Sequence, residues 1–402
     1  MLASFVPHTY HGAPMKLFLA ALLLALAPAL LAVTADDQER DRKQAIAEAR
    51  QAEDLMADGR YADAEAAFRE IVRAHEKTLG ADHELILAAR AQVGLTLRYE
   101  GKLPEALKQL RTVAQIDERV LGTDHRETLS CRHNLAATLL EAGKFDEAED
   151  EMREVLDGKR RVLGEEDPDT LTAWSNFAGA LMAKGEYLEA TKESRALLAV
   201  RSRVLGDDHP NTLATRTNVA LGLLAQARYA EAESELRPLL AGLRRVQGEK
   251  TPDTLKTWAT LAKVEWKQGK YADAENDYHG VLDQMSTVLT PDDPLFLSAL
   301  VGLAGTRNAE GYHAEAEAEY RKILVVREKV LGPTHPDVGD LLLRIGLCQY
   351  EQKKVTKETL GFARRAEAIF AGTLGPGSEP ARTAAQLRLR AEAALAPSVS
   401  KK

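Results

Sequence analysis

A Leu-Gly pair that returns at one constant step limits, more than any other feature, how this chain can fold. We define the repeat step as the interval from Leu79 to Leu121. The copies that keep this step or a multiple of it are Leu79-Gly80, Leu121-Gly122, Leu163-Gly164, Leu205-Gly206 and Leu331-Gly332. A second landmark, typified by the sequence GKYADAEN from Gly269, keeps the same step at positions 59, 101, 143, 185, 227, 269 and 311. Two independent landmarks with one period indicate an array of similar units, each too small to bury a core alone.

Each unit is predicted to contain two helices. In residues 168–206, apolar residues recur at helical spacing, first up to Gly185 and then up to Gly206. A glycine directly after a helix takes a left-handed conformation that other residues resist, so both glycines are predicted helix ends. One position of the second landmark is alanine in every copy, and its small side chain is expected to let helices pack closely. These alanines are Ala64, Ala106, Ala148, Ala190, Ala232, Ala274 and Ala316.

The unit resembles a tetratricopeptide repeat in the long form found in kinesin light chains and related bacterial arrays. The residues that carry the resemblance are LGDDHP at 205–210, Asn-Val-Ala at 218–220 and Tyr-Ala-Glu-Ala at 229–232. The resemblance covers about residues 38–375 and therefore about eight units.

This resemblance implies an all-α, right-handed superhelical solenoid of helix–turn–helix repeats. The repeat array is predicted over residues 36–375, a C-terminal capping helix within 376–396, and a disordered tail over 397–402. In the family, the first helix of each unit lines a concave groove, and the second helix lies outside. A last unit with a polar outer face is what such an array needs where it meets water.

The N-terminal segment differs from the array. From Met15 the chain reads MKLFLAALLLALAPALLAVTA, a single lysine followed by an apolar run that ends in small residues. This pattern is typical of a secretory signal peptide. We predict a signal peptide over residues 1–35, translated from Met15 and cleaved after Ala35. The expected location is extracytoplasmic, either periplasmic or secreted, without a stable membrane span, and an uncleaved membrane anchor is the alternative.

Charge and cysteine content exclude several classes of function. The formal net charge of -8 argues against nucleic acid as a partner, because phosphate binding needs an excess of lysine and arginine. Cys131 and Cys348 lie five units apart and share no metal-ligand spacing, so they are predicted to be buried free thiols. A protein or an extended peptide is therefore the expected partner.

Four histidines occur at one repeat position, His83, His125, His209 and His335, and resemble a column of metal ligands. Stacked helices place equivalent residues about 10 Å apart, whereas zinc needs several ligands within about 2.0–2.3 Å. A turn and capping role is therefore predicted for the histidines, and neither a metal site nor a cofactor is expected.

Three asparagines are the first candidates for the binding site. Family geometry places Asn134, Asn176 and Asn218 on the first helices of three successive units, facing the groove. In the family such side chains pair with the backbone of an extended peptide, since an amide both donates and accepts hydrogen bonds. The alternative is that these asparagines only brace adjacent helices.

The next first helix adds cations and an aromatic residue. Lys256, Lys263 and Lys267 are seven and four residues apart, so they share one helical stripe, and Trp266 supplies an apolar anchor. Together with the asparagines they predict a groove for an extended, acidic or carboxylate-bearing segment. The alternative is that the three lysines form a solvated face.

No motif for catalysis was found in the sequence. It contains no nucleophile motif, phosphate-binding glycine loop or HExxH helix. Its Glu-Ala-Glu stretches fall on the predicted outer helices, where ion pairs four residues apart explain them. We predict a non-enzymatic binding scaffold. The alternative is an architectural protein of the cell envelope that self-associates through its end faces or through residues 380–396.

Overall fold

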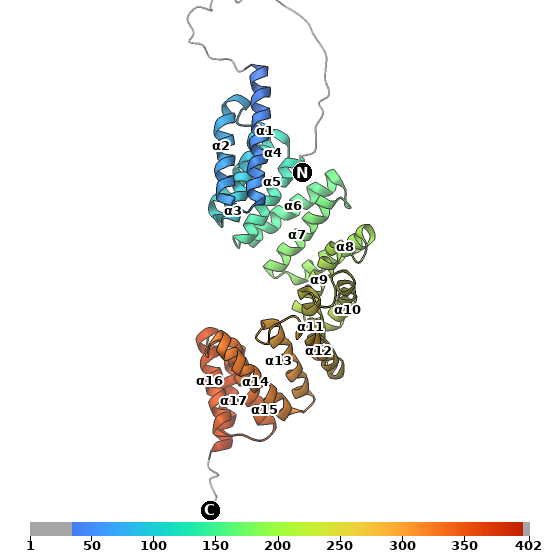
Figure 1. The fold of residues 1–402 in the computed structure, drawn as a ribbon, viewed down its shortest axis with the longest axis vertical. Helices are drawn as coiled ribbons and strands as arrows, with labels where there is room; N and C mark the ends of the chain where they lie inside the picture. Colours follow the sequence, from blue (N-terminus) through green and yellow to red (C-terminus); the bar gives the residue numbers. More distant parts are fainter. Residues whose placement is uncertain (1–33, 397–402) are drawn as a thin grey trace, which may run out of the picture. The chain divides into compact units, whose positions relative to one another are not determined.

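The computed structural model describes residues 34–396, so most of the predicted signal peptide and the predicted tail lie outside the described residues. Within this range the chain forms 17 helices and no strand (Figure 1). The first helices of the successive pairs are α1 (Ala35–Ala57), α3 (Glu84–Tyr99), α5 (Arg126–Glu141), α7 (Pro168–Lys184), α9 (Pro210–Ala225), α11 (Pro252–Lys267), α13 (Pro294–Ala309) and α15 (Pro336–Glu351). The second helices are α2 (Tyr61–Leu79), α4 (Leu103–Leu121), α6 (Phe145–Leu163), α8 (Tyr187–Leu205), α10 (Tyr229–Val246), α12 (Tyr271–Met285), α14 (His313–Leu331) and α16 (Lys357–Thr373).

The helix starts keep the period of the sequence. Second helices from α2 to α14 each begin one repeat step after the preceding one, and so do first helices from α3 to α15. After the eighth pair, α17 (Glu379–Leu395) packs its alanine face against α16. The predicted all-α repeat solenoid is thus confirmed. The described residues form two compact units, one that ends at Gly101 and one that begins at Lys102.

Histidine side chains cap the first helices. In α9 the Nδ1 atom of His209 accepts the backbone N–H of Asn211 at 3.1 Å, and an imidazole caps α3, α5 and α15 in the same way. Asp167 and Asp293 take this position in α7 and α13. A side-chain acceptor at this position satisfies a backbone N–H that has no partner within the helix. The predicted capping role of the histidines is therefore confirmed.

The glycines that end the second helices differ from the prediction. Gly206 has φ 89° and ψ 159°, which is not the left-handed helical region but an extended region open essentially to glycine alone. The difference arises because the chain turns directly after this glycine, and the backbone N–H of His209 donates to the Gly206 carbonyl at 3.3 Å. Gly185, at the end of α7, does adopt the left-handed helical conformation, with φ 89° and ψ 10°.

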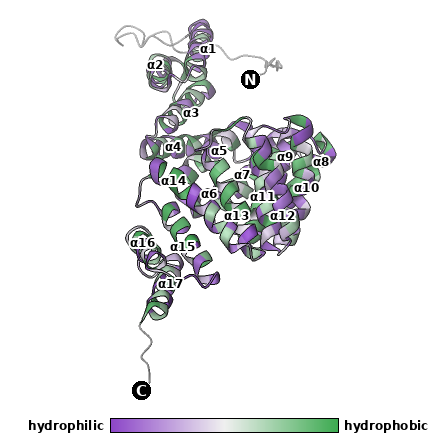
Figure 2. Cartoon of the chain, turned by 60° about the horizontal axis from the view of Figure 1, so that its bottom comes forward, coloured by the Kyte–Doolittle hydropathy of each residue, from purple (hydrophilic) through white to green (hydrophobic). Residues whose placement is uncertain are grey.

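Small residues hold the helices together. All seven landmark alanines are 0% exposed, and Trp174 is 3% exposed, as expected for packing residues. The aromatic residues that begin the second helices pack less completely, since Phe145 and Tyr187 remain 37% and 38% exposed. Apolar and polar segments alternate along the helices, as an amphipathic array requires (Figure 2). Among residues 34–396, no helix has both the length and the apolar character needed to cross a membrane.

The glutamates of the landmark are more buried than the sequence indicated. Glu149 pairs with Arg153 four residues on, as predicted, but it also accepts a bond of 2.6 Å from Lys184 at the end of α7. Glu233 does the same in α10, where it accepts from Arg237 and Lys270. Burial would raise the pKa of Glu233, but the bonds from Lys270, Arg237 and Gln268 lower it to about 2. These carboxylates therefore join successive units rather than only decorating the outer helices.

Candidate functional site

Two neighbouring cavities open on the face formed by the first helices α9, α11, α13 and α15. One has a volume of 320 Å³ and lies between α9 and α11, and the other has a volume of 470 Å³ and lies between α11 and α15. We call them the α9–α11 cavity and the α11–α15 cavity. Lys256 and Thr260 of α11 line both, so the two cavities adjoin on one surface.

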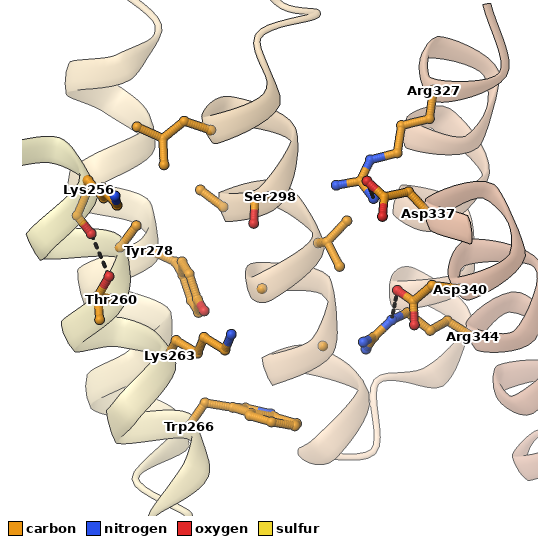
Figure 3. A pocket seen from close by; sticks show the side chains of 16 residues that line it. Lys256, Thr260, Lys263, Trp266, Tyr278, Ser298, Arg327, Asp337, Asp340 and Arg344 are labelled. Carbon is orange, nitrogen blue, oxygen red and sulfur yellow. Dashed lines mark hydrogen bonds and ion pairs between the residues drawn. The ribbon is translucent and has the colours of Figure 1, made fainter. Parts of the chain in front are cut away.

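The α11–α15 cavity is lined by both charged and uncharged side chains, and its charged groups lie on two opposite sides (Figure 3). On one side, Lys256, Lys263 and Trp266 project from α11. On the opposite side, Arg327 of α14 lies 3.1 Å from Asp337, and Arg344 lies 2.7 Å from Asp340, both carboxylates being on α15. Each arginine therefore already has an acidic partner within the wall.

Glycines in α13 make room for the floor of this cavity. The Tyr278 ring from α12 packs against Gly302, and a Cβ atom at position 302 would lie 2.2 Å from the ring carbon Cζ. Tyr278 is only 4% exposed, and this burial raises the pKa of its hydroxyl above the usual range. At neutral pH the phenol is thus a neutral group beneath the charged rim.

Arg344 remains positively charged in a partly buried position. Burial alone would lower the pKa of Arg344, but the Asp340 carboxylate and the Tyr320 hydroxyl stabilise the cation and raise the pKa overall. Its guanidinium lies 5.9 Å from the centre of the Tyr320 ring. The arginine is therefore a fixed part of the wall.

The two lysines of α11 differ from these arginines. Lys256 and Lys263 are exposed, and neither has an ion-pair partner within 4.0 Å anywhere in residues 34–396. Beside them, the indole Nε1 of Trp266 is buried and faces no acceptor in the same part of the chain. Two exposed ammonium groups on one helix are thus available to an acceptor from outside.

The α9–α11 cavity has a different lining. Leu213, Leu224 and Leu239 contribute apolar side chains from α9 and α10, and Leu221 at the mouth is 46% exposed. Asn218 and Thr217 of α9 are polar groups of its wall, and Asp253, Lys256, Thr257 and Thr260 of α11 line its other side. The side formed by α9 and α10 is thus rich in leucine, whereas the side formed by α11 is polar.

The predicted site residues are therefore only partly brought together. Asn218 and Lys256 line the α9–α11 cavity, while Lys256, Lys263 and Trp266 line the α11–α15 cavity. Lys267 lines neither cavity. Its ammonium sits 4.8 Å from the centre of the Trp266 ring. Its position at the last residue of α11 places it beyond the end of the cavity.

The other two asparagines lie outside both cavities. Asn176 of α7 bonds through its amide to Nε2 of His133 on α5 at 3.0 Å, which is the bracing role given above as the alternative. Asn134 is half-buried on α5. The asparagines thus do not act as one uniform line.

Sequence reasoning missed several lining residues, namely Tyr278, Gly302, Arg327, Asp337, Asp340 and Arg344. The repeat register contained a usable signal. Successive repeat steps from Asn218 lead to Thr260, Gly302 and Arg344. A glycine in one unit and an arginine at the same repeat position of the next unit indicate a cavity with a charged wall.

The described residues offer little for metal binding or thiol chemistry. In the range 34–396, no group of three or more histidine, cysteine or acidic side chains is placed to hold a metal ion. Cys131 and Cys348 are buried and free, as predicted, and burial raises the pKa of each thiol to about 12. Both thiols are therefore protonated at neutral pH and are poor nucleophiles.

The solved structure of RapI supports the fold, and two further structures align with lower TM-scores. RapI in its apo form aligns with a TM-score of 0.57 at 11% identity, over 87% of this chain and 98% of that one. Kinesin light chain-type TPR-like repeats from Podosopora anserina align with a TM-score of 0.48 at 24% identity, over 51% of this chain and 96% of that one. A tetratricopeptide repeat protein from Parabacteroides merdae aligns with a TM-score of 0.46 at 17% identity, over 76% and 99% of the two chains.

Sequence comparison identifies the family. No curated protein is similar enough in sequence to match this chain. Family models described as tetratricopeptide repeats match residues 43–113, 87–161, 169–245 and 297–337, which together span more than half of the chain. With this match and its array of helix pairs that keep one repeat step, the chain belongs to the tetratricopeptide repeat family.

Proposed function

We propose that this chain is a non-enzymatic scaffold that binds an extended segment of a partner protein across α9, α11, α13 and α15. A tetratricopeptide solenoid is a protein–protein interaction scaffold. The observation that carries the proposal is the pair of adjoining cavities that share Lys256 and Thr260 on one face. A surface with adjoining cavities fits an extended chain, because such a chain presents its side chains to pockets at regular intervals.

Charge favours a segment that bears carboxylates. The two arginines of the α11–α15 cavity are neutralised by Asp337 and Asp340, whereas Lys256 and Lys263 have no acidic partner among the described residues. An incoming carboxylate gains a charge-assisted hydrogen bond there without displacing an existing one. Asn218 adds an amide that can pair with the backbone of the segment.

Peptide selection tests this proposal directly. The full chain is used to select binders from a library of displayed random peptides, and affinities are then measured for Asn176→Ala, Asn218→Ala and Lys263→Glu. We expect Asn218→Ala and Lys263→Glu to weaken binding and Asn176→Ala to change it least, because Asn176 bonds to His133. The matched control is Lys192→Glu, an equal charge change on the exposed surface of α8. Unchanged affinity in both groove variants would remove this surface from the function.

The end of the array favours a monomeric scaffold over an architectural role. The outward side of α17 exposes Arg382, Gln386 and Arg390, and Leu389 is the large apolar residue among them. Such a polar surface suits contact with water. Size-exclusion chromatography with light scattering is expected to show a monomer. A discrete dimer lost on Leu389→Ser would instead support the architectural alternative.

The proposed location is extracytoplasmic, on the strength of the signal-type sequence between Met15 and Ala35. Cleavage after Ala35 would also remove Thr34, whose hydroxyl accepts the Asp37 N–H and caps α1. Cell fractionation with N-terminal sequencing is expected to find a chain that begins at Asp36 outside the cytoplasm. An uncleaved chain in the membrane would support the anchor instead, and a full-length chain in the cytoplasm would reject export.

A further inference from the structure

The two cavities differ in chemistry, and this difference carries information about the partner. In the α9–α11 cavity, leucines line the side formed by α9 and α10, and Leu221 leaves nearly half of its surface exposed at the mouth. The same repeat position holds Ala137, Gly179, Lys263 and Gly305 in neighbouring units, and the half-buried Leu95 and Leu347 in units further along the array. Among the described residues, Leu221 is therefore the aliphatic side chain at this position that is largely exposed, and it borders the leucine-rich hollow.

The α11–α15 cavity selects for a single negative charge. Its exposed donors without an ion-pair partner among the described residues are Lys256 and Lys263. Asp337 and Asp340 lie in the opposite wall and limit how much negative charge the cavity accepts. A doubly charged phosphate would have to compete for Arg327 and Arg344, so a carboxylate fits these partners better.

The spacing of the cavities limits the separation of the two ligand groups. The α9–α11 cavity lies between adjacent first helices, whereas the α11–α15 cavity spans from α11 across α13 to α15. Packed helices are about 10 Å apart, and an extended peptide rises about 3.3 Å per residue. The distance between the cavity centres thus corresponds to roughly three to five residues of extended chain.

We infer that the partner segment carries an aliphatic side chain and an aspartate or glutamate roughly three to five residues apart. The aliphatic side chain enters the α9–α11 cavity beside Leu221, and the carboxylate enters the α11–α15 cavity between Lys256 and Lys263. This inference rests on the proposed function, and it adds which side chains the groove accepts and in what spacing. The preference follows from two neighbouring pockets that share α11, one with a leucine-rich wall from α9 and α10 and one with lysines on α11 facing ion pairs on α14 and α15.

The experiment uses the strongest peptide selected against the full chain. Three forms of this peptide are compared: the parent, one with the aliphatic residue replaced by alanine, and one with the acid replaced by its amide. Each is measured against the wild type, Leu221→Ser, Lys263→Gln and the control Lys192→Gln. Both positions in the groove are solvent-exposed, so these replacements leave the fold intact, and thermal unfolding monitors this. Free and amidated C-termini separate a terminal carboxylate from a side-chain carboxylate.

We expect each change to the peptide to weaken wild-type binding by about tenfold or more, as for one buried aliphatic group or one charge-assisted bond. The acid-to-amide change in the peptide should weaken binding to Lys263→Gln only slightly, because this variant has already lost the charge-assisted bond. The aliphatic-to-alanine change should likewise weaken binding to Leu221→Ser only slightly, because this variant has already lost the apolar contact. Amidation of the terminus should be neutral.

Selected peptides without this spacing, or full losses that persist in the two groove variants, would overturn the inference while leaving groove binding intact. A loss caused only by terminal amidation would also overturn it, by assigning the charge to the chain end. Unchanged affinity of the parent peptide for Leu221→Ser, Lys263→Gln and Asn218→Ala would instead reject the proposed function, because binding would then lie elsewhere.

Discussion

Two stretches of the second compact unit have the same helical repeat but different surfaces. The asparagine face consists of α5, α7 and α9, and the cavity face consists of α11, α13 and α15. One repeat position distinguishes them, and its residues are Asn134, Asn176 and Asn218 on the first face and Thr260, Gly302 and Arg344 on the second. Helix starts keep the same repeat step through both faces, so the backbone pattern does not account for the difference.

The comparison shows how this array changes its surface without changing its fold. On the asparagine face, Asn176 reaches across to His133 of the preceding unit. On the cavity face, Gly302 has no side chain, so Tyr278 moves in beneath it and the charged rim of the α11–α15 cavity stays open. The contrast between Asn176, which bridges two helices, and Gly302, which leaves a hollow, thus lies in one side chain at the same repeat position.

The largest expected effect comes from filling the glycine of the cavity face. Gly302→Ala would place a methyl group within 2.2–2.5 Å of three atoms of the buried Tyr278 ring. Displacing this ring should lower the free energy of unfolding by about 1–3 kcal/mol. The matched control is Gly179→Ala on the asparagine face, which meets nothing within 4 Å. Because glycine weakens a helix, the control should raise stability by about 0.5–1 kcal/mol. Denaturant unfolding measures both, and equal effects of one sign would refute the contrast.

A buried acid distinguishes the cores behind the two faces. Glu265 of α11 is fully buried, and the equivalent residues on the asparagine face are Leu139, Leu181 and Leu223. Burial and the neighbouring Asp277 carboxylate raise the pKa of Glu265 from 4.5 to about 8, against the opposing charge of Arg237. Since the folded chain then holds this proton more tightly than the unfolded chain, stability should fall as the pH rises between these two values.

Glu265→Gln keeps the side chain neutral and should remove that loss. We expect the variant to be more stable than the wild type near pH 9 and nearly equal to it near pH 4. Urea unfolding across this pH range is the measurement. Asp150→Asn, on the exposed surface of α6, is the control and should leave the slope unchanged. A wild-type slope that survives in Glu265→Gln would assign the pH dependence to another group.

Periodicity and local chemistry made the fold predictable, but not the whole site. The repeat step, the capping histidines such as His209 and the buried alanines are properties of single units, so one copy informs about all. The cavities instead combine residues from up to three units. Arg344, for example, contacts Tyr320 only because their two units pack against each other. Helical spacing also grouped Lys267 with Lys263, but it could not show that the Lys267 ammonium lies on the Trp266 ring.

The turns that end the first helices provide a case in which the two faces should behave alike. Ala227 after α9 and Lys353 after α15 adopt φ values of 55° and 58°, where most repeats have glycine. This left-handed conformation costs a residue with a Cβ atom about 1 kcal/mol. Ala227→Gly and Lys353→Gly should therefore each raise stability by about 1 kcal/mol, as measured by thermal unfolding. Gly185→Ala, at the equivalent turn after α7, should lower it. A gain on one face only would show that the turns, too, differ between the faces.

The smallest expected effect isolates the bridge on the asparagine face. Asn176→Ala removes one partly buried hydrogen bond to His133 and should lower the free energy of unfolding by about 0.5–1 kcal/mol. Thr260→Ala changes the same repeat position on the cavity face, where the hydroxyl bonds only to the Lys256 carbonyl of its own helix. Alanine favours a helix, so this variant should lose nothing. A double-mutant cycle with His133→Ala separates the bridge from the other interactions of that histidine. A coupling near zero would mean that the asparagine face is held by packing alone, and the distinction between bridged and open helices would then rest on Gly302 and Tyr278.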